Sequence, residues 1–273
     1  MEGLVTTHTL SREDLESIFR CVVVRTRLCG SMKVACSFQG TGTRTRTTFM
    51  QALSQLGLSH VDLPVFLDTS ENLRDLAGYL DVYYDLYVIR YRDHERLSEF
   101  NSYSKRPVIN AMSCLEHPCE AIADAYWFQT KVKGLKGATV VLWGPLTNVL
   151  RSWRNVATAA GAEAHVVLDP AVLPPQVDLV VTDGFPEPNA DAPLTGLSLA
   201  HLEKMGTPML LPTPPFTVGR ELLFDPLEYA RFSGYAQKRY LLDVQKAIIF
   251  WIMGRHQIRE TDGDASAATI SVP

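Results

Sequence analysis

Short apolar runs alternate along the chain with segments whose apolar residues recur at helical spacing. The runs predict strands at residues 33–38, 59–63, 86–90, 108–111, 140–143, 165–168, 178–181 and 208–211. The segments between them predict helices at residues 12–28, 43–56, 71–82 with Ser70 as its cap, 94–103, 118–133, 148–160 and 237–254. Alternation of this kind is typical of parallel sheets that are covered by helices on both faces.

The pattern therefore predicts an α/β protein with two doubly wound parallel-sheet domains. The helix that begins at Pro118 joins the domains, and the C-terminal helix packs back on the first domain. We place the first domain at residues 1–126 together with 237–258, and the second at 127–236. Residues 259–273 are small and polar, and we expect them to form a disordered tail.

Composition narrows the class of protein. Of the 273 residues, 46% are hydrophobic and 21% charged, which is typical of globular domains. No apolar run reaches the roughly 18 residues of a membrane span, and residues 1–9 do not resemble a secretory signal. Five cysteines without a CxxC pair indicate a reducing compartment, so we expect a cytoplasmic protein. The net charge of −4 gives no general attraction to nucleic acid or membrane, so any bound anion needs local groups.

The first candidate site follows the first predicted strand, at Gly42-Thr43-Arg44-Thr45-Arg46. The N–H groups and the dipole of a starting helix favour an anion, and hydroxyl and guanidinium groups add hydrogen bonds to phosphate. The two arginines are two residues apart and point to different sides of the helix, so one is available for a ligand and the other for an acid within the fold. Taken alone, the segment is also compatible with a helix cap and a solvated basic face.

Two further candidates stand at the ends of predicted elements. Arg90 ends an apolar strand, where it is either a solvent-exposed residue or an anion ligand. His117 begins the interdomain helix, where a histidine tends to stay neutral and donate a hydrogen bond, unless its role is structural. A nucleophilic pair of His117 and Cys119 is disfavoured, because residues so close in sequence rarely have the required geometry.

In this order, the segments resemble the aspartate/ornithine carbamoyltransferase family. That family carries Ser-Thr-Arg-Thr-Arg after its first strand, an arginine at a strand end, and His-Pro-Thr-Gln at the start of its interdomain helix. Here the last motif reads His117-Pro118-Cys119-Glu120. The resemblance covers about residues 10–255 and is strongest in the first domain. It implies a homotrimer with sites at subunit boundaries, and no metal or organic cofactor.

The resemblance also implies roles for the residues of the first domain. Thr43, Arg44, Thr45 and Arg90 would bind the phosphate of carbamoyl phosphate, in the turn that begins at Gly42. Thr45, Arg90 and His117 would polarise the carbamoyl carbonyl. The family's Gln that holds the carbamoyl NH2 group is Glu120 here. Residues 63–70 match a loop in which aspartate-type enzymes carry a lysine, but they contain none.

The acceptor site departs further from the family. Asp183 stands where ornithine-type members place an Asp that contacts the amino group of the acceptor. Arg151 stands where aspartate-type members place an arginine that binds a carboxylate. The segment Leu211-Pro212-Thr213-Pro214 replaces a His-Pro-Leu-Pro motif, and we assign Pro212 and Thr213 to substrate binding through the backbone turn. These residues predict an amino-acid-like acceptor that is neither plain aspartate nor ornithine.

The predicted function is carbamoyl transfer from carbamoyl phosphate to the amine of such an acceptor, with release of phosphate. The alternative is a non-catalytic trimeric member that acts as a scaffold or partner subunit, which the missing loop lysine favours. A dinucleotide-dependent oxidoreductase would share the alternating fold, but Gly144 stands alone after its strand without a GxGxxG motif.

Overall fold

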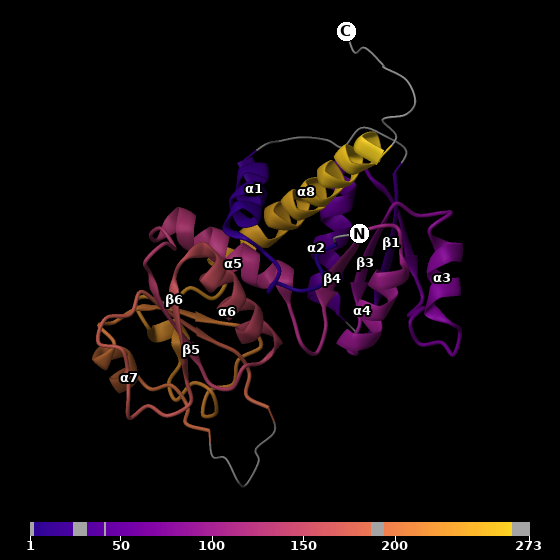
Figure 1. Cartoon of the computed structure of the whole chain (residues 1–273). Helices are drawn as coiled ribbons and strands as arrows, with labels where there is room; N and C mark the ends of the chain where they lie inside the picture. Colours follow the sequence, from indigo (N-terminus) through magenta and orange to yellow (C-terminus); the bar gives the residue numbers. More distant parts are fainter. Residues whose placement is uncertain (1–2, 24–31, 41, 187–193, 264–273) are drawn as a thin grey trace.

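The computed structural model describes residues 3–23, 32–40, 42–186 and 194–263, and contains two four-stranded parallel sheets (Figure 1). The first sheet has the order β2-β1-β3-β4. Its strands are β1 (Lys33–Phe38), β2 (Ser59–Leu63), β3 (Leu86–Arg90) and β4 (Val108–Met112). The second sheet has the order β6-β5-β7-β8. Its strands are β5 (Thr139–Trp143), β6 (Glu163–Val167), β7 (Leu179–Thr182) and β8 (Met209–Pro212).

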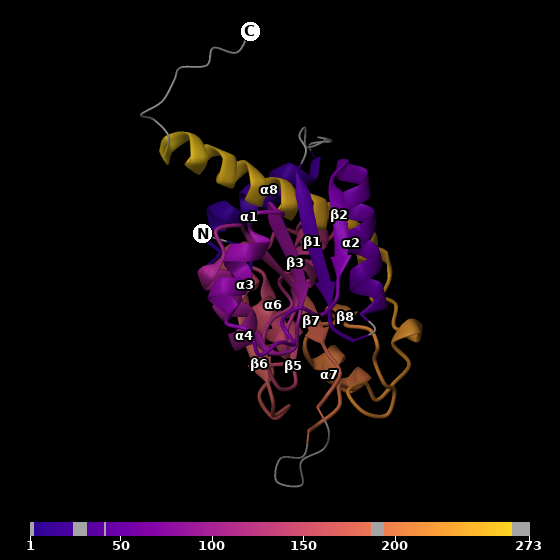
Figure 2. The ribbon, with the colours of Figure 1, turned by 90° about the vertical axis from the view of Figure 1, so that its right-hand side faces the viewer.

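Helices cover both faces of the first sheet. On one face lie α1 (Arg12–Val23), α2 (Thr43–Leu56), α5 (Pro118–Lys131) and α8 (Arg239–Gly263), and on the other α3 (Leu73–Leu80) and α4 (His94–Tyr103). Strand β1 has apolar side chains on both faces. Val34 and Cys36 are buried in the core beneath the first set of helices, and Ala35 is buried in the core beneath α3 and α4. Figure 1 and Figure 2 show α8 lying across this half beside α1 and α2, as predicted for the C-terminal helix.

Helix α5 joins the two halves. It packs against α8 on the first half and against α6 (Asn148–Ala160) on the second. One hydrophobic core runs through this contact, from Val88 of β3 through Ile122 of α5 to Trp153 of α6 and Leu142 of β5. A separate core covers the other face of the second sheet, beneath α7 (Leu199–Lys204). The predicted fold class is therefore confirmed, including the interdomain helix.

Several boundaries differ from the predictions. Helix α3 begins after Asn72, whose side chain accepts a hydrogen bond from the backbone N–H of Arg74, and not after Ser70. Helix α7 (Leu199–Lys204) was not predicted, nor were the 3-10 turns η1 (Pro226–Glu228) and η2 (Ala236–Lys238). Helix α1 ends at Val23, and residues 24–28 of its predicted span lie outside the described residues.

The C-terminal helix is longer than predicted. It continues past Gly254 to Gly263, because a single glycine inside a helix costs only about 1 kcal/mol and extending a formed helix is easy. Residues 259–263 of the predicted tail are therefore helical, and residues 264–273 lie outside the described residues. Within the described ranges, no helix has the length and apolar character to cross a bilayer.

Candidate active site

Each sheet has a switch point in its strand order, from which the connections leave in opposite directions. Strand β1 connects through α2 to β2 on one side, and β3 connects through α4 to β4 on the other. The connections therefore diverge between β1 and β3, and they do so again between β5 and β7. In open parallel sheets, ligands bind beyond the carboxyl ends of strands at such switch points.

A cavity of about 860 Å³ lies at this position and is lined by residues of both halves. Nine of the predicted site residues line it: Gly42, Thr43, Arg44, Thr45, Arg90, His117, Glu120, Asp183 and Thr213. Its volume falls in the range of small-molecule sites. The structure thus brings together residues that are up to 171 positions apart in the sequence.

The start of α2 is open to an anion. Gly42 precedes the helix in the left-handed region (φ 37°), it provides no side-chain cap, and the first turn has no acidic residue. Its missing side chain matters as well, because a Cβ there would lie 3.2 Å from Cδ of Arg90. The first N–H groups of α2 and the Arg90 side chain therefore face the same space, where they favour a phosphate.

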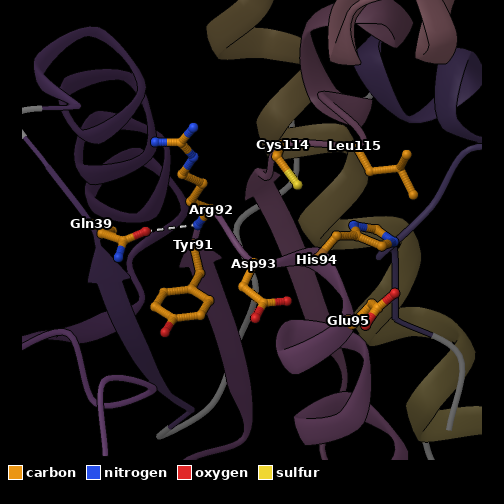
Figure 3. A pocket seen from close by; sticks show the side chains of 8 residues that line it. All are labelled: Gln39, Tyr91, Arg92, Asp93, His94, Glu95, Cys114 and Leu115. Atoms are coloured by element: carbon orange, nitrogen blue, oxygen red, sulfur yellow. Dashed lines mark hydrogen bonds between the residues drawn. The ribbon is translucent and has the colours of Figure 1, made fainter.

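Arg90 is held in place on both sides of the strand end. Its Nη1 donates to Oγ1 of Thr45 at 3.1 Å. Gln39 fixes the backbone: its N–H donates to the Arg90 carbonyl at 2.9 Å, and its Oε1 accepts from the N–H of Arg92 at 2.8 Å (Figure 3). Burial lowers the pKa of Arg90 below its ordinary value, and the nearby charge of Arg44 lowers it further.

Figure 3 shows the hydrogen bond between Gln39 and Arg92 in a second, open hollow of about 530 Å³. The hollow is lined by side chains from the ends of β1, β3 and β4 and from the start of α4, among them Gln39, Arg92, His94 and Cys114. None of the predicted site residues lines it.

His117 begins α5 on a buried hydrogen-bond network. Its backbone N–H donates to Oγ of Ser152 on α6 at 2.9 Å, and Ser152 donates to Oε2 of Glu116 at 2.5 Å. Glu116 is only 2% exposed and also accepts from Thr7 at 2.6 Å and from Asn155 at 3.2 Å. The network joins the N-terminal segment, α5 and α6, and it fixes the position from which the His117 ring enters the cavity.

The His117 ring is held as a neutral imidazole. Burial lowers its pKa below the ordinary value and outweighs the opposite effect of Glu120, whose Oε2 lies 4.0 Å from His117 Nε2. A neutral ring keeps one N–H group as a donor to a carbonyl oxygen. Cys119, two residues on, is fully buried, and burial raises the pKa of its thiol well above the ordinary value, so it is no thiolate nucleophile.

A lysine that the sequence did not single out lies next to these groups. Lys238, at the end of η2, donates to Oε1 of Glu120 and lies 3.3 Å from Oδ1 of Asp124, one turn further along α5. Burial works to raise the pKa of Glu120, but Lys238 and His117 hold it below its ordinary value. Burial raises the pKa of Asp124 to about 6, although Lys238 acts to lower it. No sequence signal marked Lys238, because its partners are 114 and 118 residues away.

The second half supplies the rest of the cavity wall. Asp183 follows β7, and burial raises the pKa of its carboxyl group. Thr213 follows β8, and the carbonyl of Pro214 accepts a hydrogen bond from Nη1 of Arg44 at 2.9 Å, across the crevice. The cavity is also lined by Asn148, Tyr235 and Lys238, which the sequence did not single out.

Two predicted site residues do not line the cavity, namely Arg151 and Pro212. Arg151 lies on α6 and is partly exposed, whereas Asn148 and Val149 at the start of the same helix line the cavity. Arg46 likewise turns away from the cavity and pairs with Asp62 of β2. Of the two neighbouring arginines at the start of α2, Arg44 is thus the one that faces the crevice.

Comparisons with known proteins agree with this geometry. Residues 3–130 match the family described as aspartate/ornithine carbamoyltransferase, carbamoyl-P binding domain. The chain is 30% identical to an ornithine carbamoyltransferase of Methanopyrus kandleri, over 93% of this chain and 99% of that protein. Among solved structures, an ornithine carbamoyltransferase of Pyrococcus furiosus is similar with a TM-score of 0.81 and 23% identity, over 93% of this chain and 97% of that one. An aspartate transcarbamoylase of Trypanosoma cruzi, in complex with aspartate and phosphate, is similar with a TM-score of 0.72 and 20% identity, over 92% and 94% of the two chains.

Proposed function

Because this chain belongs to the aspartate/ornithine carbamoyltransferase family, we propose that it transfers the carbamoyl group of carbamoyl phosphate to the amine of an amino-acid-like acceptor and releases phosphate. One observation carries the proposal. The start of α2, the end of β3 and the start of α5 bring Arg44, Arg90 and His117 to one cavity between the halves. Two guanidinium groups at a helix N-terminus suit a phosphate, and a neutral histidine suits a carbonyl.

The same residues account for the chemistry. The amine nitrogen attacks the carbonyl carbon, and negative charge develops on the carbonyl oxygen. Donors at Thr45, Arg90 and His117 stabilise that charge, and this kind of preorganised stabilisation is the largest contribution in many enzymes. The bond between the carbonyl carbon and the phosphate oxygen then breaks. The phosphate leaves with the electron pair toward Thr43, Arg44 and the N–H groups of α2, and it takes up the proton that the amine nitrogen loses.

On the acceptor side, Asp183 is the group suited to an amino group. It lies at the carboxyl end of the second sheet, on the opposite wall from the proposed phosphate site. Thr213 and the Pro214 carbonyl add polar contacts from the turn after β8. The position of Arg151 outside the cavity gives it at most an indirect part in acceptor binding.

These positions support an assignment of each substrate to its own domain. Residues 1–126 together with 237–258 form the carbamoyl-phosphate-binding domain, and residues 127–236 form the acceptor-binding domain. The match of residues 3–130 to a carbamoyl-P binding domain supports the first assignment. The family resemblance supports a homotrimer, and the five cysteines without a CxxC pair support a cytoplasmic location.

An acceptor panel tests the proposal. Phosphate release from carbamoyl phosphate is followed with ornithine, aspartate, lysine and other amino acids, each against a blank without acceptor. We expect at least one amino-acid-like acceptor to accelerate release far above the blank. A protein that binds carbamoyl phosphate but shows no acceptor-dependent release would instead fit the non-catalytic alternative.

A further inference from the structure

Lys238 stands out among the cavity residues because it reaches the site from the C-terminal end of the chain. Its side chain is 26% exposed, and that of its partner Glu120 is 12% exposed, so the ion pair lies in the wall of the cavity and not on the outer surface. Asp124, the second partner, is 2% exposed and lies behind it. The pair thus presents one side to a ligand and the other to the core.

The ion pair with Lys238 offsets the negative charge that Glu120 brings to the cavity. Glu120 places a carboxylate in the cavity that holds the two guanidinium groups, where a bound phosphate would be repelled by it. Both Arg44 and Lys238 act on Glu120 electrostatically, and Arg90 and Lys238 act on His117, so all five groups lie within one short-range electrostatic cluster. Of the cations that the structure describes, Lys238 is the one that contacts Glu120 directly.

The ammonium group also retains a donor. It has three N–H bonds, of which one goes to Glu120 and one to Asp124. Among the residues that the structure describes, no acceptor takes the third. An ammonium group that lines a cavity with one N–H bond left over is suited to an oxygen of a ligand.

We propose that Lys238 is a substrate-binding residue of the acyl phosphate site: its ammonium group neutralises Glu120 beside the bound phosphate and donates its third N–H bond to an oxygen of the substrate. The inference rests on the proposed function. It leaves Glu120 able to accept from the carbamoyl NH2 group through Oε2, which accepts no hydrogen bond from the described residues and lies 4.0 Å from Nε2 of His117. A purely structural ion pair, which would tie η2 to α5, is the alternative.

A set of four variants separates the two roles. Lys238→Met removes the cation, Glu120→Gln removes the carboxylate, and the double variant removes both. Lys246→Met is the matched control, because Lys246 lies on α8 outside the cavity, is also 26% exposed, and also pairs with a carboxylate, Asp243 at 2.7 Å. For each variant we would measure the Kd of inorganic phosphate by calorimetry and the KM of carbamoyl phosphate.

We expect Lys238→Met to weaken phosphate and carbamoyl phosphate binding by about 10- to 100-fold, as for the loss of a charge-assisted contact. Glu120→Gln should bind inorganic phosphate at least as tightly as the wild type, because the repelling carboxylate is gone and Lys238 keeps Asp124 as its partner. The double variant should bind phosphate at least about 5-fold more tightly than Lys238→Met alone, since the repelling carboxylate is gone. Lys246→Met should bind like the wild type.

Unchanged phosphate affinity in Lys238→Met would overturn the proposal, and so would a double variant that binds no better than the single one. If Lys238→Met does not fold, Lys238→Gln, which keeps a donor for Glu120 but no charge, carries the same expectation. A wild-type protein that binds phosphate but has no transferase activity would contradict the proposed function. The phosphate affinities of the variants would then still decide whether Lys238 binds the anion. A wild-type protein that binds neither ligand would overturn both.

Discussion

At the scale of single residues, two arginines two positions apart have different surroundings. Arg44 faces the crevice and donates to the Pro214 carbonyl of the other half, whereas Arg46 pairs with Asp62 on the outer strand β2. The helical rotation of about 100° per residue separates them by more than half a turn. Arg44 is therefore the candidate phosphate ligand, and Arg46 is a control for it from the same motif.

Replacing Arg44 with Ala should weaken the binding of carbamoyl phosphate by about 1.5–3 kcal/mol, the value of a charge-assisted contact. Arg46→Ala loses an exposed ion pair worth about 0–1 kcal/mol of stability and should bind the ligand like the wild type. Calorimetry with both variants checks this. Equal affinities of the two variants would show that Arg44 is not a phosphate ligand.

Asp183 and Arg151 form a second pair for comparison. Asp183 lines the cavity and Arg151 does not. Asp183→Asn should raise the KM of the acceptor by about 10- to 100-fold, since a contact between charged groups is lost, and should leave the affinity for carbamoyl phosphate unchanged. Arg151→Ala should have a smaller effect. Steady-state kinetics with both substrates varied would contradict the assignment if the Arg151 variant were the more impaired.

At the scale of elements, the N-terminal segment helps to hold the start of α5. Its Leu4 pairs with the edge of β4, where its N–H donates to the Val108 carbonyl at 2.8 Å and its carbonyl accepts from Asn110 at 2.9 Å. A few residues on, Thr7 donates to the buried Glu116. The segment thus ties the first sheet to the network on which His117 depends.

Glu116→Gln should lower the free energy of unfolding by about 1.5–3 kcal/mol. The variant replaces one carboxylate oxygen by an NH2 group, which would face hydroxyl and amide groups that donate to Glu116 in the wild type. It should also lower kcat, since the Ser152 contact to the His117 backbone loses its support. Glu163→Gln, on the exposed edge strand β6, is the control and should change stability by less than about 0.5 kcal/mol. Denaturant unfolding curves compare the two, and equal midpoints would contradict the role given to Glu116.

Most elements could be predicted from the sequence because apolar runs and capping residues agree locally. The capping pair at Ser11 and Asp14 shows this, since each side chain accepts from the other's backbone N–H at about 3 Å. The start of α3 could not be predicted from the sequence, because Ser70 and Asn72 are equally good N-caps. The burial of Leu73 and Ala77 decides between them. Lys238 could not be predicted either, since its partners on α5 are brought near only when the chain returns to the first half.

At the scale of the whole molecule, the cavity exists because the two halves are joined twice. Helix α5 connects them directly, and after the second sheet the chain returns through η2 and α8 to pack on α1, α2 and α5. The hydrogen bond from Arg44 to the Pro214 carbonyl crosses the crevice between them. Binding of both substrates between the halves therefore depends on contacts that neither sheet provides alone.

The proposed assembly is also testable at this scale. Three chains of 30.4 kDa make a particle of about 91 kDa, and we expect that mass in sedimentation equilibrium. A homotrimer places identical surfaces around a three-fold axis, so the mass should not depend on concentration once the trimer has formed. A particle of 30.4 kDa with full transferase activity would contradict the trimer.

The measurement that tests the central claim most directly is the stoichiometry of transfer. Carbamoyl phosphate labelled in its carbonyl carbon is incubated with the protein and the best acceptor of the panel, and labelled acceptor and free phosphate are counted together. The account predicts one labelled acceptor for each phosphate released, and an equal decrease of both products in the Arg44→Ala variant at limiting carbamoyl phosphate. Phosphate release without label in the acceptor, or equal transfer by the Arg44→Ala variant, would contradict it.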